Sequence, residues 1–241
     1  MYRERAAVGI RAAVRWASVT SGGGPVRVLP DGCLDLLWSS RAGLLVAGPD
    51  RVAQVSWSAP GERWIGLRLP PGVGPAVFGV PAEELRDRRV PLADLWGRAA
   101  VELAERFGVA TDPPGSRWAA AGATILEEVA RARLRAAGGP DPLGAHVAAR
   151  LAAGATVAAT AAEVGLGVRA LHRRSRALFG YGPKTLARIL RLRRALDLAR
   201  GGVPLAEVAV RSGYADQAHL TRDVRELAGV PPTRLLAPPT D

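Results

Sequence analysis

The segment AEVAVRSGYADQAHLTRDVRELAGVPPTRL, residues 206–235, repeats the pattern of an earlier segment, AAEVGLGVRALHRRSRALFGYGP, residues 161–183. Between Gly165 and Gly213 the offset is 48 residues, and beyond them it is 49. The extra residue falls in a turn, where an insertion is tolerated best. Each copy predicts a helix, a glycine-containing turn, a second helix and a final Gly and Pro, which is the outline of a helix-turn-helix unit. The positions that match at the offset of 49 are Leu171 and Leu220, Arg173 and Arg222, Gly180 and Gly229, and Pro183 and Pro232.

The chain around this repeat is predicted to be wholly helical. The turn-forming run Gly138-Gly139-Pro140 marks where this part begins. Beyond it, glycine, proline or polar turns separate short helical stretches, as in a compact bundle with short connections. The expected helices cover residues 142–153, 156–164, 168–179, 184–200, 204–212, 216–228 and 231–236.

Residues 1–139 have a different pattern and hold all six tryptophans. Short β-compatible runs between Gly and Pro turns predict strands of a small sandwich or barrel. Helical stretches follow at 92–109 and 116–137, the second with an apolar stripe at helical spacing. The predicted strands are VRVLP (26–30), LDLLWSS (34–40), LLVAG (44–48), VAQVSWS (52–58) and RWIGLRL (63–69). The stripe consists of Trp118, Ala121, Ile125, Val129 and Ala132.

The fold class expected from these patterns is α+β, in three parts. Residues 1–112 form a β-rich, sandwich- or barrel-like domain of the sensor or dimerisation kind, and residues 113–139 form a helical connector. Residues 140–241 form an all-α domain with tandem helix-turn-helix units. No run approaches the about 18 apolar residues of a membrane span, and the N-terminus lacks the apolar region of a secretory signal. We therefore expect a cytoplasmic, nucleoid-associated protein without membrane contact.

The charge favours a polyanionic partner. The sequence holds 33 basic and 22 acidic residues, a net charge of +11, which favours nucleic acid before membrane. Nearly all the basic residues are arginine, and a GC-rich coding sequence produces the same enrichment without a functional cause. The positions of the charges along the chain are therefore better evidence for nucleic-acid binding than their number. Arg169–Arg194 contains nine basic residues and no acid. A solvated helix face is the alternative interpretation of such a run.

Residues Pro140–Leu236 resemble the DNA-binding domain of the arabinose-regulator (AraC-type) transcription factors. The second repeat is similar to the family signature: an apolar helix, Gly213-Tyr214, a polar pair with Gln217, Leu-x-Arg, then Gly-Val-x-Pro. The resemblance implies two helix-turn-helix units joined by a long linker helix. The two units are expected to read adjacent major-groove segments of double-stranded DNA. Departures from the family pattern are Ser175, Val224 and Asp223. The linker arginines are interpreted as structural residues or as phosphate contacts.

The resemblance and the amphipathic pattern together give candidate DNA contacts. On the first recognition helix these are Arg169, His172, Arg173 and Arg176, and on the second Gln217, Thr221 and Arg222. Arginine can bind guanine and glutamine can bind adenine, each through two hydrogen bonds, while phosphate contacts position the domain. For Arg222 we expect a weaker role than for Arg173, because Glu226 lies at ion-pairing distance along the helix and Asp223 would repel phosphate.

The N-terminal half resembles a sensor-like domain found upstream of this DNA-binding domain in many bacterial regulators. The strings LPDGCLDLLW and GVPAEELRDRRVPLADLWG carry this resemblance, and the ligand of that domain is undefined. For a small effector, the candidate binding residues are Trp38, Trp57, Trp64 and Cys33, since an aromatic-lined pocket is the usual ligand site. The alternative is that this half only dimerises or binds a protein and that its tryptophans are core residues.

An enzyme using Cys33 is the least favoured alternative. Asp31, Cys33 and Asp35 alternate, so a strand would place all three on one face. No Ser/His/Asp or Cys/His pattern accompanies them, and one cysteine excludes a disulfide framework or a zinc site built on several thiolates. We expect a ligand-responsive transcription factor that is not an enzyme, with no cofactor or metal. Its expected partners are double-stranded DNA, a small effector, a second copy in a homodimer, and RNA polymerase.

Residues 140–241 are expected to fold as an isolated fragment, because they have the size of a typical domain and short connections. Thermal unfolding followed by far-ultraviolet circular dichroism should show a helical spectrum and a cooperative transition. A fragment without a cooperative transition would place the domain boundary elsewhere than at Gly138–Pro140.

Overall fold

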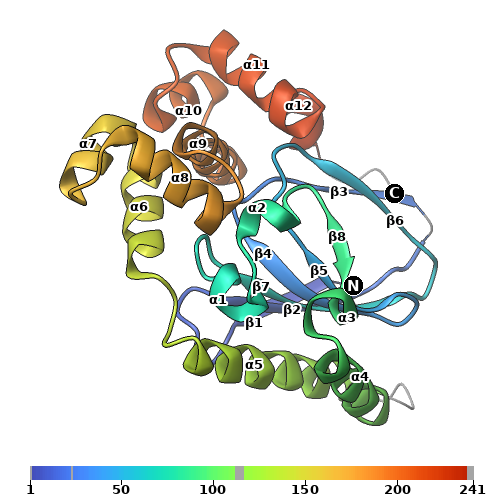
Figure 1. Ribbon diagram of the computed structural model, residues 1–241. Coiled ribbons are helices and arrows are strands. Elements are labelled where there is room, and N and C mark those ends of the chain that lie inside the picture. Colours follow the sequence, from blue (N-terminus) through green and yellow to red (C-terminus); the bar gives the residue numbers. More distant parts are fainter. Residues whose placement is uncertain (1, 23, 112–116, 238–241) are drawn as a thin grey trace.

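The computed structural model describes residues 2–22, 24–111 and 117–237 and has an α+β fold (Figure 1). The boundary predicted at residue 112 lies outside the described residues. The strands are β1 Tyr2–Ala6, β2 Val14–Val19, β3 Gly24–Val28, β4 Leu34–Ser39, β5 Gly43–Ala47, β6 Gln54–Ser58, β7 Arg63–Leu69 and β8 Arg89–Pro91. The helices are α1 Gly74–Phe78, α2 Ala82–Leu85, α3 Leu92–Trp96, α4 Arg98–Thr111, α5 Trp118–Ala136, α6 Pro142–Ala152, α7 Val157–Glu163, α8 Val168–Phe179, α9 Pro183–Arg200, α10 Leu205–Ser212, α11 Gln217–Ala228 and α12 Pro232–Leu235.

The N-terminal half is built on an antiparallel sheet with the strand order β1-β2-β7-β4-β5-β8, and β3 and β6 form a separate two-stranded ribbon. The five strands expected from the sequence are present as β3 to β7, each within a few residues of the expected bounds. Three strands were missed: β1, β2 and β8. Neither of the first two is an apolar run: β1 alternates arginine with other residues and is exposed along its whole length, and β2 contains Arg15 and is mostly half-buried.

The two faces of the sheet differ in character, since side chains alternate along each strand. On one face the side chains of Ile65, Leu67 and Leu36 are fully buried against the helices. The opposite face carries Trp64 and Arg68 of β7 and Asp35 of β4. The register of β4 and β7 places Asp35 directly opposite Arg68. The apolar face makes the core, and the polar face remains available for a site.

Helices α4 and α5 lie beneath the sheet in Figure 1, and α5 packs on β7 and β2. The buried line of α5 contains Ala123, Leu126 and Ala130, with Gly122 and Glu127 beside them. The stripe expected from the sequence flanks this line: Trp118, Ile125 and Val129 are partly buried and pack against the same core, while Ala132 is exposed. The most buried line lies beside the stripe, where Gly122 allows close approach to the sheet. Glu127 is buried and accepts a hydrogen bond from the Val8 N–H.

The C-terminal half contains the seven helices expected from the sequence, α6 to α12, and they share a second apolar core. The internal repeat corresponds to two helix-turn-helix units, α7–α8 and α10–α11. Gly165 and Gly213 both adopt positive φ, +66° and +80°, in the turns within the units. Gly180 and Gly229 end the second helices at φ of +84° and +72°. The matched prolines begin α9 and α12.

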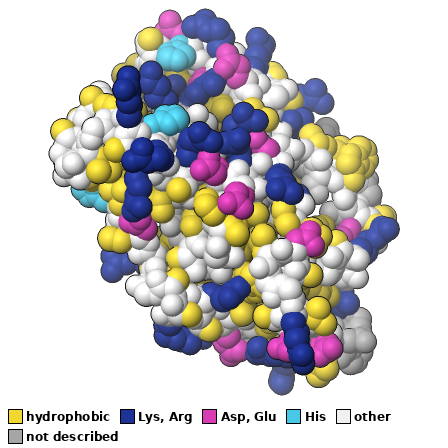
Figure 2. Space-filling model, viewed as in Figure 1, with side chains coloured by type: hydrophobic (Ala, Val, Ile, Leu, Met, Phe, Trp, Pro, Cys, Tyr) yellow, Lys and Arg dark blue, Asp and Glu magenta, His cyan; other side chains and the backbone are white. Residues whose placement is uncertain are grey.

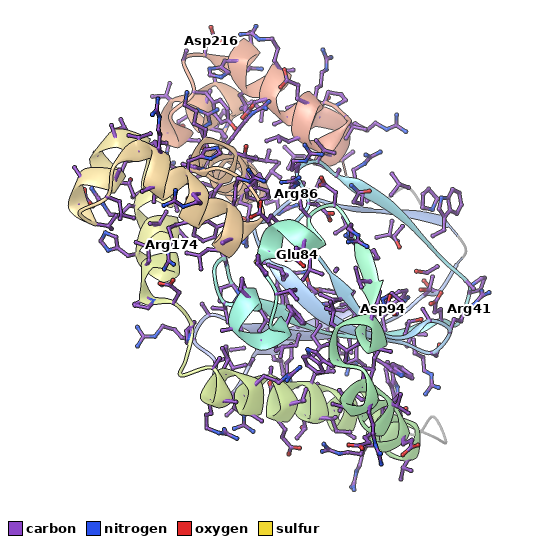
Figure 3. All side chains as sticks on the ribbon, viewed as in Figure 1. Arg41, Glu84, Arg86, Asp94, Arg174 and Asp216 are labelled. Carbon is purple, nitrogen blue, oxygen red and sulfur yellow. The ribbon has the colours of Figure 1, made fainter. Side chains whose placement is uncertain are left out.

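The two halves contact each other through α2, the β3–β6 ribbon and the loop before β4. Arg86 Nη1 donates to the Gly180 carbonyl oxygen at 2.9 Å, where α8 ends (Figure 3). Arg27 Nη1 donates to the Ala228 carbonyl oxygen at 2.8 Å, where α11 ends. Both second helices are thus held at their C-terminal ends by the N-terminal half. Within the described residues no helix has the length and apolar character needed to cross a membrane.

Gly122 and Gly108 provide a matched test of the packing of α5. A Cβ at Gly122 would lie 2.3 Å from Ile65 Cδ1, whereas a Cβ at Gly108 in α4 would meet no atom within 4 Å. We expect Gly122→Ala to destabilise the protein by about 1–3 kcal/mol through overpacking. Gly108→Ala should stabilise it by about 0.5–1 kcal/mol, because alanine favours the helix.

Urea unfolding followed by tryptophan fluorescence measures both changes, since all the tryptophans lie in this half. Equal stability of Gly122→Ala and the unmodified protein would contradict the close approach of α5 to β7.

Candidate functional site

The first recognition helix, α8, buries one face and exposes a basic one. Leu171, Leu178 and Phe179 are buried in the C-terminal core. Arg169 and Arg173 are exposed on the opposite side. His172 is also exposed, and its imidazole lies against the turn that begins α9: a Cβ at Gly182 would come within 2.5 Å of His172 Nε2. Figure 2 shows Lys and Arg side chains gathered over the C-terminal helices on this face of the molecule.

Two arginines of α8 are already engaged within the protein. Arg176 Nη2 lies 2.6 Å from Glu83 Oε2, on helix α2 of the N-terminal half. Arg174 pairs with Asp141, the N-cap residue of α6 (Figure 3). Of the four candidates on α8, Arg169, His172 and Arg173 therefore share an open surface, while Arg176 faces the junction between the halves.

The second recognition helix, α11, is capped by Asp216, whose carboxylate accepts a hydrogen bond from the His219 N–H at 2.6 Å. Asp216 stands at the outer end of the helix in Figure 3. Arg173 and Arg222, which occupy matched positions in the two copies of the repeat, are both exposed. Gln217 is also exposed, and Thr221 Oγ1 donates to the Gln217 carbonyl oxygen at 2.8 Å.

The expected pairing of Arg222 with Glu226 is wrong. Glu226 pairs with Arg188 of α9 instead. Asp223 also turns inward: its side chain is only 4% exposed and pairs with Arg188 and with Arg191 Nη2, the latter at 3.2 Å. The cause is helical geometry, since Asp223 lies beside the buried residue Val224 and faces α9 rather than the solvent. Neither acid neutralises Arg222.

Asp223 is the centre of a buried polar cluster. Tyr214 Oη donates to Asp223 Oδ2 at 3.0 Å, and the Arg191 guanidinium lies 4.3 Å from the centre of the Tyr214 ring. Burial and the neighbouring carboxylate raise the pKa of Tyr214. The acid that departs from the family pattern therefore joins α11 to α9 through a tyrosine and two arginines.

The linker helix α9 uses most of its arginines internally. Arg194 Nη2 donates to the Arg211 carbonyl oxygen at 2.8 Å, and Arg188 and Arg191 pair with Asp223. A cleft of about 370 Å³ lies beside these residues, between the two units. Its wall includes Lys184, which is exposed. The sequence left open whether the linker arginines are structural residues or phosphate contacts. Arg188, Arg191 and Arg194 make structural contacts within the protein.

A larger cavity, of about 820 Å³, lies between the polar face of the sheet, the β3–β6 ribbon and α9. The sheet contributes Trp16, Trp64, Asp35 and Arg68. Helix α9 closes the opposite side with Arg193, Leu196, Asp197 and Arg200. The cavity is therefore bounded by both halves of the chain.

The floor of this cavity is built around Gly66. A Cβ there would lie 2.2 Å from the Trp16 ring, so only glycine allows the indole to lie across β7. The indole Nε1 then donates to Asp35 Oδ1 at 3.1 Å. Burial raises the pKa of Asp35 to about 6, against the opposing effect of Arg68. Burial also raises the pKa of Asp50, which pairs with Arg89.

Of the four residues predicted from the sequence to bind an effector, two line the cavity and two lie elsewhere. Trp64 and Cys33 line the cavity. Trp38 lies on the other face of the sheet, stacked on Phe107 with ring centres 5.5 Å apart, and Trp57 is 72% exposed. The residues that sequence reasoning did not select are Trp16, Asp35, Arg68 and Arg89. The signal for Asp35 was present in the spacing of Asp31, Cys33 and Asp35: all three line the cavity, Asp35 from β4 and the other two from the loop before it.

The surroundings of Cys33 do not activate a thiol. Burial, with Asp31 and Asp35 nearby, raises its pKa well above the usual value. The thiol therefore stays protonated at neutral pH, whereas nucleophilic cysteines have a lowered pKa.

Each half of the chain contains a segment that matches a known family model. Residues 160–237 match a family model described as a helix-turn-helix domain, and residues 12–91 match one described as a domain of unknown function (DUF6597). No match was found among the curated proteins.

Among solved structures, an apo variant of ToxT from Vibrio cholerae strain SCE256 is similar over 93% of this chain and 97% of its own, with 11% identity and a TM-score of 0.50. A probable AraC family transcriptional regulator from Rhodopseudomonas palustris CGA009 is 24% identical over 40% of this chain and 95% of its own, with a TM-score of 0.35. ToxT with a bound unsaturated fatty acid has a TM-score of 0.49 at 11% identity, covering 96% of each chain.

The matched domain and the paired helix-turn-helix units define a DNA-binding transcriptional regulator. Proteins of this class are not ordinarily enzymes. The chain therefore combines a C-terminal helix-turn-helix domain with an N-terminal domain that matches a model of unknown function.

Asp223 and Glu226 share Arg188, and they provide a test of the contact between α9 and α11. Removing the buried carboxylate in Asp223→Ala leaves Arg191 and Tyr214 without their acceptor, so we expect a loss of roughly 1.5–3 kcal/mol of stability. Glu226→Ala removes a pair whose carboxylate is 65% exposed, so its effect should stay below about 1 kcal/mol. Thermal unfolding followed by far-ultraviolet circular dichroism compares the two. Similar losses of stability in Asp223→Ala and Glu226→Ala would contradict the role of Asp223 in joining α9 and α11.

Proposed function

We propose that the chain binds its operator through α8 and α11, which read adjacent major-groove segments within a DNA-binding domain of residues 140–241. The main support is that the repeat leaves Arg173 and Arg222 exposed at matched positions. Among the described residues, the neighbouring carboxylates pair with other arginines. Arg169, His172, Gln217 and Thr221 complete the contact surface. Arg176 joins it when the pair with Glu83 opens.

We expect Arg173→Ala and Arg222→Ala to weaken operator binding to similar extents, each by about 1–3 kcal/mol, with relaxed preference at one base pair. This replaces the sequence-based expectation that Arg222 contributes less, because Glu226 and Asp223 face α9. Each lost phosphate contact would also reduce the slope of log affinity against log salt by about 0.9. Fluorescence anisotropy with operator DNA selected from genomic fragments measures both quantities.

Arg98→Ala is the matched control, since it removes one positive charge from the far side of the molecule, where Arg98 is 92% exposed and pairs with Glu102. An equal loss in this control would attribute the effect to net charge. Unchanged affinity in both test variants would contradict the proposed reading helices.

We propose further that a small effector occupies the cavity between the sheet and α9 and controls DNA binding. The support is that one helix serves both regions. Leu196 and Arg193 of α9 line the cavity, while Arg188 of the same helix holds α11. An occupant of the cavity would therefore contact the element that sets the position of the second unit relative to the first.

The proposal also includes a homodimer, contact with RNA polymerase at the promoter and a location in the cytoplasm on the nucleoid. It favours a sensor over a purely dimerising N-terminal half, because a cavity partly lined by aromatic residues, rather than a filled barrel, faces α9.

A further inference from the structure

We propose that the floor of the cavity binds the protonated nitrogen of an organic amine, held by the carboxylates of Asp35 and Asp31 beside the rings of Trp16 and Tyr2. The inference rests on the proposed effector role of the cavity and assigns a chemical class to its ligand.

The distribution of ion pairs in the cavity is the first argument. Most guanidinium groups of the wall already have acceptors of their own. Arg89 binds Asp50 through two hydrogen bonds, of 3.0 and 2.6 Å. Arg200 Nη1 lies 3.7 Å from Asp197 Oδ1, and Arg27 donates to the Ala228 carbonyl oxygen. Arg193 Nη1 points to the Asp31 carbonyl oxygen at 3.4 Å. Arg89 and Arg200 are thus neutralised by carboxylates of their own, whereas Arg27 and Arg193 hydrogen-bond to carbonyl oxygens.

The carboxylates of the floor, in contrast, share one cation. Arg68 Nε lies 3.3 Å from Asp31 Oδ2 and 3.6 Å from Asp35 Oδ1, and it makes no hydrogen bond with either. Among the described ion pairs, Arg68 is the one guanidinium within 4 Å of these two carboxylates, so one of them has no ion-pair partner of its own. Buried charges are stable only when they are paired. A cationic ligand group supplies the missing charge at this place.

The aromatic residues of the floor provide the second argument. The rings of Tyr2 and Trp16 lie 5.8 Å apart, and Trp64 lines the same cavity. Aromatic faces attract ammonium groups, and they do so more strongly away from water. Leu37, Leu45 and Ala47 complete the floor with apolar surface. The combination of carboxylates, aromatic rings and apolar surface suits an ammonium group on an apolar body.

The protonation of Asp35 gives the site a pH signature. Its pKa of about 6 reflects burial first, with Arg68 lowering it and Asp31 raising it. The other groups that face it are Trp16 of β2, which donates to it, Cys33 of its own segment, Arg89 of β8 and Arg193 of α9. A bound ammonium group favours the ionised form of Asp35, so protonation of this carboxylate competes with amine binding. The affinity for an amine therefore falls as the pH drops through 6.

Three probes with one apolar body and different head groups test the class: 2-phenylethylamine, 3-phenylpropanoate and 2-phenylethanol. Isothermal titration with the full chain at pH 7.5 should show binding of the amine at least about tenfold tighter than of the other two. The amine should bind about tenfold more weakly at pH 5 than at pH 7.5. Because this pH measurement uses the unmodified protein, it does not depend on the folding of any variant.

Asp35→Asn should weaken amine binding about tenfold or more. Asp94→Asn makes the same change of charge on α3, away from the cavity (Figure 3), and should leave binding unchanged. Retention of amine affinity in Asp35→Asn would overturn the site.

The remaining outcomes separate the ligand class from the effector role. Tighter binding of the carboxylate, or equal binding of the alcohol, would overturn the amine while leaving the cavity as an effector site. If none of the probes bound or changed the operator affinity of the full chain, the amine and the effector role would both be contradicted.

Discussion

Helix α9 packs at the same time against both helix-turn-helix units and the N-terminal half, and the arrangement of the whole molecule depends on this contact. Its apolar residues Leu186, Ile189 and Leu192 lie in the C-terminal core. Its arginines hold α11 through Asp223, and its last turns close the cavity above the sheet. One helix therefore contacts the cavity and both helix-turn-helix units.

Arginine has two distinct roles in this chain. Exposed guanidinium groups at Arg169, Arg173 and Arg222 give a surface suited to phosphate and guanine. Others, such as Arg188 and Arg86, bind carboxylates or helix-end carbonyl oxygens and hold elements together. The planar guanidinium, with five donors, can serve both purposes. Net charge alone therefore overstates the number of arginines available to DNA.

The two-faced sheet explains why one small N-terminal half can have both a core and a site. Strict alternation sends one set of side chains to the helices and the other to the cavity. Gly66 then allows Trp16 to lie across the polar face and reach Asp35. A side chain at position 66 would remove this contact, so the cavity floor depends on a residue without one.

The sequence by itself determined the local structure and the class of protein. Glycine in turns with positive φ and proline at helix starts act on only a few neighbouring residues. The repeat, the seven C-terminal helices and the exposure of Arg173 and Arg222 were therefore predictable from the sequence. Alternation likewise placed Asp35 of β4 and Arg68 of β7 on the same face of the sheet. Only the tertiary structure decided which arginines are paired, because Glu226 and Asp223 find partners more than 30 positions earlier in the chain. The cavity was also decided by the tertiary structure alone, since its walls come from segments that meet only when β2, β7 and α9 are packed together.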